Sequence, residues 1–303
     1  MNNYKLESPI VTVLMPSFNE PLRFISKTIE SVLNQTYRNF EFIIVDDSTD
    51  PITINCIDEY AKNDSRIKVV RKSNKKGVSG ARNIGIKEAK GEFIMNIDAD
   101  DVCYPDRIEN QLKGFISDDI QAVGGNLIVI DEFDNITYTP KPLSPSWSDI
   151  RKHLNEGIVD MYQPASMIRK SALLNVGCYE ELFNCSEDFD LWYKIAINYK
   201  WNIVPQCVIK YRVHGNNAHL KMNDLQARLC CIVLIKYSLK IDRCLTQDEY
   251  YTLLRIIQSN LYCRLYIYVR CIKNRLLSKV LGILNISNLL AKIIINTPKY
   301  IEL

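Results

Sequence analysis

The chain has 303 residues, 47% of them hydrophobic and 24% charged, so it is long and apolar enough for one large domain or a domain with an appendage. Its ten cysteines form no Cys-x-x-Cys pair and no spacing with histidine that is typical of zinc, so we expect free thiols in a reducing compartment. The N-terminus lacks the apolar core of a signal peptide, and no stretch reaches about 18 uninterrupted apolar residues, which predicts a cytoplasmic protein that does not span a membrane.

The net charge of +3 is unevenly distributed along the chain. Residues 221–303 contain 13 Lys or Arg against 5 Asp or Glu, whereas residues 1–220 contain 25 against 30. A change in charge balance of this kind is typical of a domain boundary. We therefore predict a main domain over residues 1–220 and a basic C-terminal extension over residues 221–303.

Short apolar runs alternate with helical patterns along the first hundred residues. Strands are expected at residues 10–15, 40–45, 67–70 and 93–97, and helices at residues 23–35, 52–62 and 78–89. Pro16 is expected to end the first run, because proline cannot continue a central strand. The alternation predicts an α/β fold with a largely parallel sheet, helices on both faces, and a ligand site outside the carboxyl ends of the strands.

Polar clusters follow three of these strands, at residues 16–20, 46–48 and 98–101. In extended chain, side chains two positions apart point the same way, so Asp98 and Asp100 should project from one side of the strand end. A divalent cation such as Mg²⁺ or Mn²⁺, alone or with a diphosphate, would offset the repulsion between them. The alternative interpretation is a solvated acidic turn, and an isolated Asp-x-Asp does not distinguish the two.

A glycine-containing segment, residues 77–83, precedes or opens the third helix. It has neither the Gly-x-Gly-x-x-Gly pattern of dinucleotide-binding proteins nor the Gly-Lys-Ser/Thr ending of P-loops, which disfavours both classes. Arg82 in this segment is either a surface cation or a residue that bridges a carboxylate or binds a phosphate.

The second half of the chain is less regular. We expect a helix at 105–115, a strand at 122–130, a loop at 131–150, a weak strand at 165–169 and a last strand at 203–213, broken by Pro205 and leading to His214. Ser186 is predicted to cap a helix that begins with Glu187 and Asp188. These acids either stabilise the helix through its dipole, or one of them is a general base.

Helical patterns rich in Leu, Ile, Tyr and basic residues fill 222–240, 247–274 and 276–296. They fit a helical bundle packed on the main domain. They also fit a peripheral contact with the inner membrane face, because cationic amphipathic helices bind anionic lipid. No recognisable motif accompanies the charge, so no nucleic-acid partner is expected.

Five motifs occur in order along the chain: Val-Thr-Val-Leu-Met-Pro-Ser-Phe-Asn-Glu, Ser-Val-Leu-Asn-Gln-Thr-Tyr, Ile-Ile-Val-Asp-Asp-Ser, Gly-Val-Ser-Gly-Ala-Arg-Asn-Ile-Gly and Asp-Ala-Asp-Asp. Together they resemble family 2 glycosyltransferases of the GT-A fold, the inverting enzymes of bacterial surface-polysaccharide and O-antigen synthesis. The resemblance covers roughly residues 8–217 and implies a Rossmann-like, mostly parallel sheet with flanking helices, followed by a C-terminal helical extension.

The resemblance also implies roles for individual residues. The nucleotide of a donor, most often a UDP-sugar, would be bound by Pro16, Phe18, Asn19, Glu20, Asp47, Arg82 and Asp98. Mn²⁺ or Mg²⁺ would be held by Asp100 and His214. Asp188 would be the catalytic base with Glu187 beside it, and Asp101 receives no role.

The implied acceptor is a hydroxyl of a saccharide, in such pathways a lipid-linked one. A non-catalytic nucleotide-sugar-binding protein and a sugar-phosphate nucleotidyltransferase are the alternatives. The N-terminal loop lacks the glycine-rich, basic signature expected of the nucleotidyltransferase.

Overall fold

The computed structural model describes residues 11–71, 77–143, 145–155, 158–183, 185–215, 224–238 and 242–259. It divides the chain into two compact units. The first unit takes in the described parts of Met1–Ser144, Met161–Asn175 and Lys200–His214. The second takes in those of Pro145–Asp160, Val176–Tyr199 and Gly215–Leu303, so it draws on segments both before and after residue 220. The predicted boundary at that residue stays a prediction.

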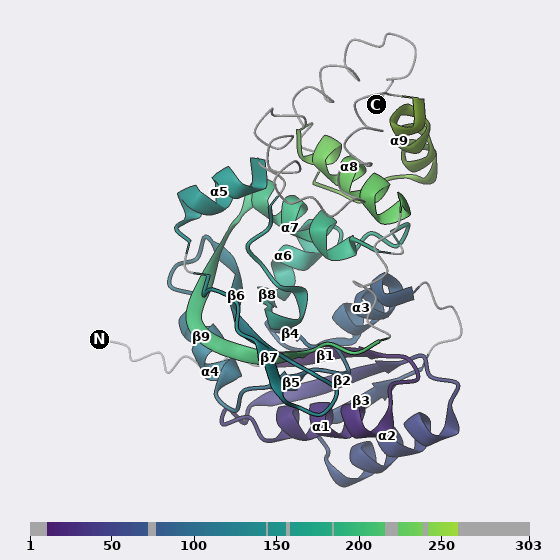
Figure 1. Ribbon diagram of the computed structural model, residues 1–303, viewed down its shortest axis with the longest axis vertical. Helices are drawn as coiled ribbons and strands as arrows, with labels where there is room; N and C mark the ends of the chain where they lie inside the picture. Colours follow the sequence, from purple (N-terminus) through teal and green to yellow (C-terminus); the bar gives the residue numbers. More distant parts are fainter. Residues whose placement is uncertain are drawn as a thin grey trace. The chain divides into compact units, whose positions relative to one another are not determined.

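The first unit begins with four parallel strands in the order β3-β2-β1-β4. Their bounds are Val11–Ser17 (β1), Phe40–Asp46 (β2), Ile67–Val70 (β3) and Phe93–Asn96 (β4). Three helices flank them, with bounds Leu22–Leu33 (α1), Pro51–Asn63 (α2) and Gly77–Glu88 (α3). The helices α1 and α2 lie on one face and α3 on the other (Figure 1). The predicted α/β alternation is confirmed in this half of the sheet.

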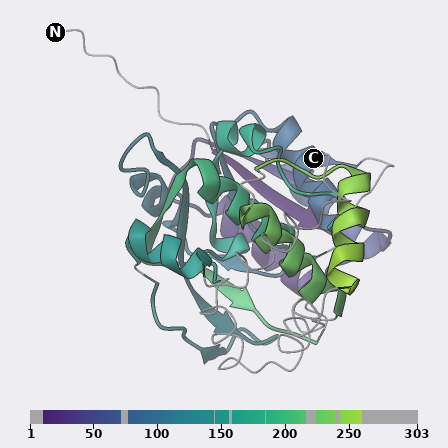
Figure 2. The same ribbon diagram turned by 90° about the horizontal axis from the view of Figure 1, so that it is seen from above.

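The sheet becomes mixed beyond β4. The strand β8 runs antiparallel to β4 and is followed by β6, β9 and β5, while β7 pairs with β6. The strand bounds are Val102–Cys103 (β5), Ile120–Ile130 (β6), Ile136–Tyr138 (β7), Met167–Arg169 (β8) and Lys200–Arg212 (β9). Three short helical elements complete the unit, Arg107–Lys113 (α4), Gln163–Ala165 (η1) and Lys170–Asn175 (α6). Figure 2 shows the same elements from above.

Two prolines lie inside strands, although the sequence predicted that each would interrupt one. Leu14 accepts a hydrogen bond from the N–H of Ile97 on the β4 side, and Ser17 accepts one from Asp47 on the β2 side. Pro16 faces the β4 side beyond the last β1–β4 pair, so its missing N–H removes no ladder bond. In β9 the pairing with β6 jumps from Val204 to Cys207, which leaves Pro205 in a bulge instead of a break.

The stretch 131–150, predicted as loop, contains β7 and the start of a helix, α5 (Trp147–Asn155). The three residues of β7 are all exposed, so this strand lacks the buried alternation on which a sequence prediction relies. A tight turn before it is stabilised by Asp131, whose Oδ1 accepts from the N–H groups of Phe133 at 2.8 Å and Asn135 at 2.9 Å.

The second unit is helical and has charged residues in its core. Besides α5 it contains Glu187–Asn198 (α7), Asp224–Ser238 (α8) and Gln247–Ser259 (α9). Lys194 of α7 and Lys236 of α8 both pair with Asp190, and all three side chains are at most 2% exposed. Because a buried charge is costly without a partner, these ion pairs tie α7 to α8.

Two of the three predicted C-terminal helices correspond to α8 and α9, but the predicted continuation beyond Ser259 and the helix at 276–296 lie outside the described residues. Within the described ranges, no helix combines the length and the apolarity needed to cross a membrane.

We predict that Gly91→Ala destabilises the first unit. A Cβ at residue 91 would lie 2.5 Å from the backbone N of Thr12 and 2.9 Å from the carbonyl carbon of Val11, and backbone cannot rotate away. The free energy of unfolding should fall by about 1–3 kcal/mol, measured by urea denaturation. Gly215→Ala is the matched control, since a Cβ there meets no described atom within 4 Å. Equal stability of the two variants would contradict the close approach.

Candidate active site

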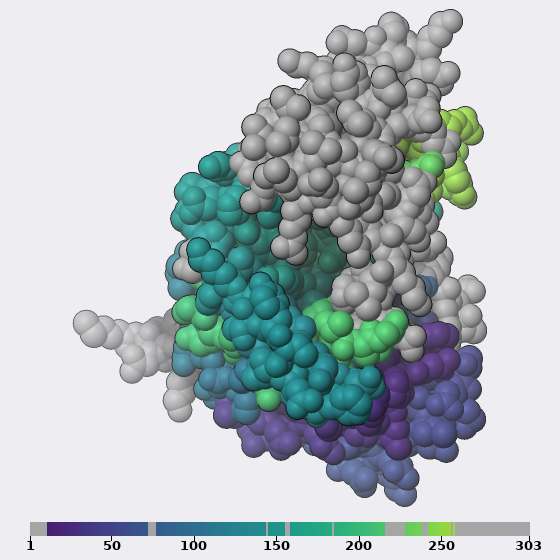
Figure 3. All heavy atoms as spheres, in the orientation of Figure 1, coloured from purple at the N-terminus to yellow at the C-terminus, as the bar shows by residue number. Residues whose placement is uncertain are grey.

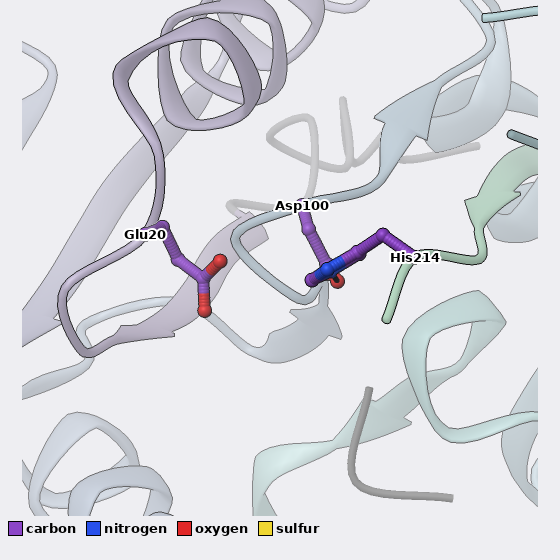
Figure 4. Close-up of side chains that lie close together, drawn as sticks. All are labelled: Glu20, Asp100 and His214. Atoms are coloured by element: carbon purple, nitrogen blue, oxygen red, sulfur yellow. Dashed lines mark hydrogen bonds and ion pairs between the residues drawn. The ribbon is translucent and has the colours of Figure 1, made fainter. Parts of the chain in front are cut away.

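Three side chains that could bind a metal converge at the carboxyl ends of the strands. Glu20 follows β1, Asp100 follows β4 and His214 follows β9 (Figure 4). Their potential ligand atoms all lie within 4.8 Å of one another, and Asp100 Oδ2 is 3.0 Å from His214 Nε2. The structure thus brings together the two residues predicted for the metal. It adds Glu20, which the sequence assigned to the nucleotide.

The loop 98–101 is held mainly through its backbone and through Asp101. This side chain is fully buried, and its Oδ1 accepts a hydrogen bond from the N–H of Arg212 at 2.8 Å. The hydroxyl of Thr28 donates to the carbonyl oxygens of Ala99 at 3.0 Å and Asp101 at 2.7 Å. Asp101, which had no predicted role, therefore positions the acids beside it.

Burial, reinforced by the crowding of negative charges, raises the pKa values of three carboxyl groups in this cluster. Burial, with smaller contributions from Asp100 and Asp98, raises the pKa of Glu20 to about 7. Burial and the charge of Asp98 raise the pKa of Asp100, while the hydrogen bond from His214 opposes that shift. Burial, followed by the charges of Asp100 and Asp98, raises the pKa of Asp101 well above its ordinary value. A divalent cation in this cluster would relieve the repulsion.

The donor set fits a divalent metal ion. Two carboxylates and one imidazole can supply oxygen and nitrogen ligands, a combination that suits Mn²⁺, whereas Mg²⁺ would rely on the carboxylates. All three side chains are partly buried, so their donor atoms are held in a defined place without being closed off from a ligand.

Arg82 reaches the same cluster from α3. Its guanidinium is 4% exposed, and Nη2 donates to Asp98 Oδ1 at 2.9 Å. Of the two interpretations of Arg82, the carboxylate bridge is the one observed. Asp98 itself keeps 34% of its side chain exposed, so it can still meet a ligand.

The predicted nucleotide residues around β1 and β2 lie on neighbouring loops. Asn19 has a left-handed φ of 53°, and its Oδ1 accepts from the N–H groups of Thr49 at 2.8 Å and Asp50 at 2.9 Å, which fixes the loop after β2. Phe18 beside it is 62% exposed, as a stacking face requires. Pro16 is half-buried near the end of strand β1.

The two acids after β2 differ in environment. Asp46 is buried and accepts from Arg71 Nε at 2.8 Å and from the N–H of Ser48 at 3.0 Å. Asp47 is half-buried, and its N–H donates to the carbonyl of Ser17. The sequence did not identify the Asp46–Arg71 pair. The apolar run that ends at Val45 indicated a buried strand end, but not which acid would turn inward.

Glu187 and Asp188 belong to the second unit, in the first turn of α7. Ser186 is the N-cap residue of α7, as predicted, but it has a left-handed φ of 61°, and its side chain makes no capping bond to a described residue. Asp188 Oδ1 accepts from the N–H of Phe189 at 2.7 Å. Glu187 is 9% exposed, and Asp188 is half-buried.

Comparison with known proteins identifies relatives of this chain. Residues 12–177 match the family model described as Glycosyl transferase family 2. An uncharacterised glycosyltransferase of Methanocaldococcus jannaschii is 32% identical over 219 residues, which cover 71% of this chain and 75% of that protein. The Escherichia coli O-antigen biosynthesis glycosyltransferase WbnJ is 30% identical over 199 residues, which cover 64% of this chain and 76% of WbnJ.

A third relative is Escherichia coli WfgD, named as a UDP-Glc:alpha-D-GlcNAc-diphosphoundecaprenol beta-1,3-glucosyltransferase. It is 30% identical over 190 residues, which cover 63% of this chain and 71% of WfgD. Among solved structures, Staphylococcus aureus TarS 1–349 in complex with UDP-GlcNAc matches with a TM-score of 0.61 at 15% identity, over 93% of this chain and 90% of that one. At 15% identity the similarity is evidence for the fold alone, and that fold is consistent with the sheet described above. The chain therefore belongs to glycosyl transferase family 2 and has the GT-A fold.

Proposed function

We propose that this glycosyltransferase is an inverting, metal-dependent enzyme that moves a hexosyl or N-acetylhexosaminyl group from a UDP-sugar to a hydroxyl of a lipid-linked saccharide. The observation that carries the proposal is the convergence of Glu20, Asp100 and His214 beside the Arg82–Asp98 pair. The donor and acceptor classes draw support from the activity for which WfgD is named and from the UDP-GlcNAc complex of TarS.

In this proposal the nucleotide lies along the ends of β1, β2 and β4. Phe18 offers an exposed ring for stacking on the base, and Asp47 accepts from its polar edge. Asp98 would accept hydrogen bonds from the ribose hydroxyls, and Arg82, which is paired with Asp98, would contact the phosphates of the donor. Pro16 and Asn19 shape the loop that carries Phe18.

Asp100 and His214 would hold Mn²⁺ or Mg²⁺, with Glu20 as a further ligand. When bound, the cation supplies positive charge against the charge that develops on the departing diphosphate. The chain's own contribution is to hold these three metal-binding side chains in place before the UDP-sugar binds.

The acceptor hydroxyl attacks the anomeric carbon opposite the departing diphosphate, so the configuration at that carbon inverts. We propose that Asp188 takes the hydroxyl proton and that Glu187 orients the acceptor. Asp188 lies in the first turn of α7, where the helix dipole favours the carboxylate form needed in a base.

We further propose that the enzyme works at the inner face of the cytoplasmic membrane, where a lipid-linked acceptor would be found. The 13 Lys or Arg against 5 Asp or Glu in residues 221–303 support this location, because anionic lipid attracts such a segment.

The pH dependence of metal binding tests the role of Glu20. Because its pKa is raised to about 7 in the metal-free protein, a cation that binds it must displace a proton below that pH. The apparent Mn²⁺ affinity should therefore fall, by up to about tenfold per pH unit, as the pH drops from 7 to 5. In Glu20→Gln the part of this pH dependence that comes from the Glu20 proton should disappear. Glu59→Gln, a change at an exposed glutamate, is the control. If calorimetry gives the same dependence of Mn²⁺ affinity on pH for Glu20→Gln and for the parent, Glu20 is not a ligand of the metal.

The variant Asp100→Asn tests the metal site itself. It should weaken Mn²⁺ binding and Mn²⁺-dependent binding of UDP, because one charged ligand becomes a neutral amide. Isothermal titration of each ligand is the measurement, and Asp118→Asn on the surface is the control. Normal binding and transfer by Asp100→Asn would exclude the assignment.

For the base, Asp188→Asn should lower transfer by about 10²–10⁴-fold while UDP-sugar binding survives, since general-base catalysis contributes about that much. Turnover is followed as UDP release with a panel of donors and saccharide acceptors. Asp248→Asn, an exposed acid in the first turn of α9, is the matched control. Full activity of Asp188→Asn would show that another group accepts the proton.

A further inference from the structure

Arg212, the last residue of β9, is fully buried and bonded to the loop 98–101, which carries the metal candidate Asp100. Its backbone N–H donates to Asp101 Oδ1 at 2.8 Å, and its Nε donates to the carbonyl oxygen of Asp100 at 2.7 Å. One residue therefore holds the acidic loop both by its backbone and by its side chain. Since a buried guanidinium is costly unless its donors are satisfied, these bonds are strongly favoured.

The other end of the same guanidinium binds the β6–β7 turn, residues 131–135. Nη1 donates to the carbonyl oxygen of Asp131 at 3.0 Å and to Asp134 Oδ1 at 2.6 Å. Lys27 of α1 also pairs with Asp134, so two cations share this carboxylate. In Figure 3 this part of the chain, coloured teal, lies at the surface, so Arg212 links a surface turn to the interior of the site.

Arg212 also sets the surroundings of His214, two residues further on. The guanidinium carbon lies 4.6 Å from the ring centroid of Phe24, and the His214 ring packs against the same phenyl ring with centroids 5.1 Å apart. Phe24 is 2% exposed and has little room to move. The side chain of Arg212 thus contacts the backbone of one metal candidate and the packing partner of another.

We propose that Arg212 is a positioning residue that holds Asp100 and His214 in the arrangement that binds a divalent cation, with the β6–β7 turn as its outer support. The inference rests on the proposed metal-dependent function. Lysine is a poor substitute, because its single ammonium group lacks the planar fork that reaches the Asp100 carbonyl on one side and Asp134 on the other.

The test compares Arg212→Lys with Arg107→Lys in the full-length protein. Arg107 is a second fully buried arginine of the first unit, and its Nη2 donates to the carbonyl oxygens of Asn96 at 2.7 Å and Ser166 at 3.3 Å. Its Nη1 donates to Cys103 Sγ at 3.4 Å, at the end of the segment 98–103. None of these bonds reaches the Asp100 carbonyl or the β6–β7 turn, so cation affinity is the measurement that separates the two arginines. Both variants keep the charge. Hydrogen exchange of metal-free protein measures the order of residues 98–103 and 131–138, and calorimetry with MnCl₂ alone measures cation affinity.

We expect Arg212→Lys to exchange faster in both segments and to bind Mn²⁺ about 10–100-fold more weakly, as is usual when a residue behind a metal ligand is changed. Arg107→Lys should lower the melting temperature yet leave Mn²⁺ affinity within about threefold of the parent. Unchanged affinity in a folded Arg212→Lys would overturn the inference, and so would an equal loss in Arg107→Lys.

Asp134→Asn keeps Arg212 itself and covers the case in which Arg212→Lys does not fold. It should speed exchange in the β6–β7 turn and weaken Mn²⁺ binding to a smaller extent, and no change in either measurement overturns the role of the turn. If the parent binds no Mn²⁺, the metal-dependent function fails. The positioning role is then decided by exchange alone, where unaltered protection of residues 98–103 in Arg212→Lys overturns it.

Discussion

Burial and mutual repulsion of carboxylates at the strand ends form the constraint on which the first unit depends. Burial raises the pKa values of Glu20 and Asp100, the charge of Asp98 raises both further, and Asp100 adds to the shift of Glu20. The fold counters this with Arg82 on Asp98 and with His214 on Asp100. Such an arrangement is destabilising in the free protein, and a cation bound there would turn the same repulsion into a source of binding energy.

The surrounding structure leaves two acids of the loop 98–101 partly accessible and buries the third. Asp98 and Asp100 keep part of their side chains accessible, whereas Asp101 is fully buried and bonded to the backbone of Arg212. Because Thr28 fixes two carbonyl oxygens of the same loop, the loop is tied to both α1 and β9. Preorganisation of this kind means that a ligand need not order the loop when it binds.

The sequence predicted the α/β alternation well because each strand of the β3-β2-β1-β4 half is a short apolar run followed by polar residues. It predicted Asp100 and His214 as partners only through the resemblance, since 114 positions separate them and no local pattern relates them. Arg212 and Asp101 were missed for the same reason. A buried arginine looks like a surface one until the carbonyls and carboxylates around it are known. Pro16 and Pro205 had the opposite effect, since the sequence predicted strand interruptions that the structure does not have. Whether a strand tolerates a proline depends on whether a neighbouring strand needs an N–H group at that position.

The first turn of α7 shows why sequence alone could not choose among its acids. At about 100° per residue, Asp190 lies close to Glu187 around the helix and nearly opposite Asp188. Asp190 is bound to Lys194 and Lys236 in the interior of the second unit, and Glu187 on the neighbouring side is 9% exposed. Asp188 is half-buried on the other side. The ionic core thus fixes the rotation of α7 about its axis. Because that rotation is set by two lysines, one of them more than forty positions downstream, packing that the local sequence does not contain determines which of the first-turn acids stays accessible.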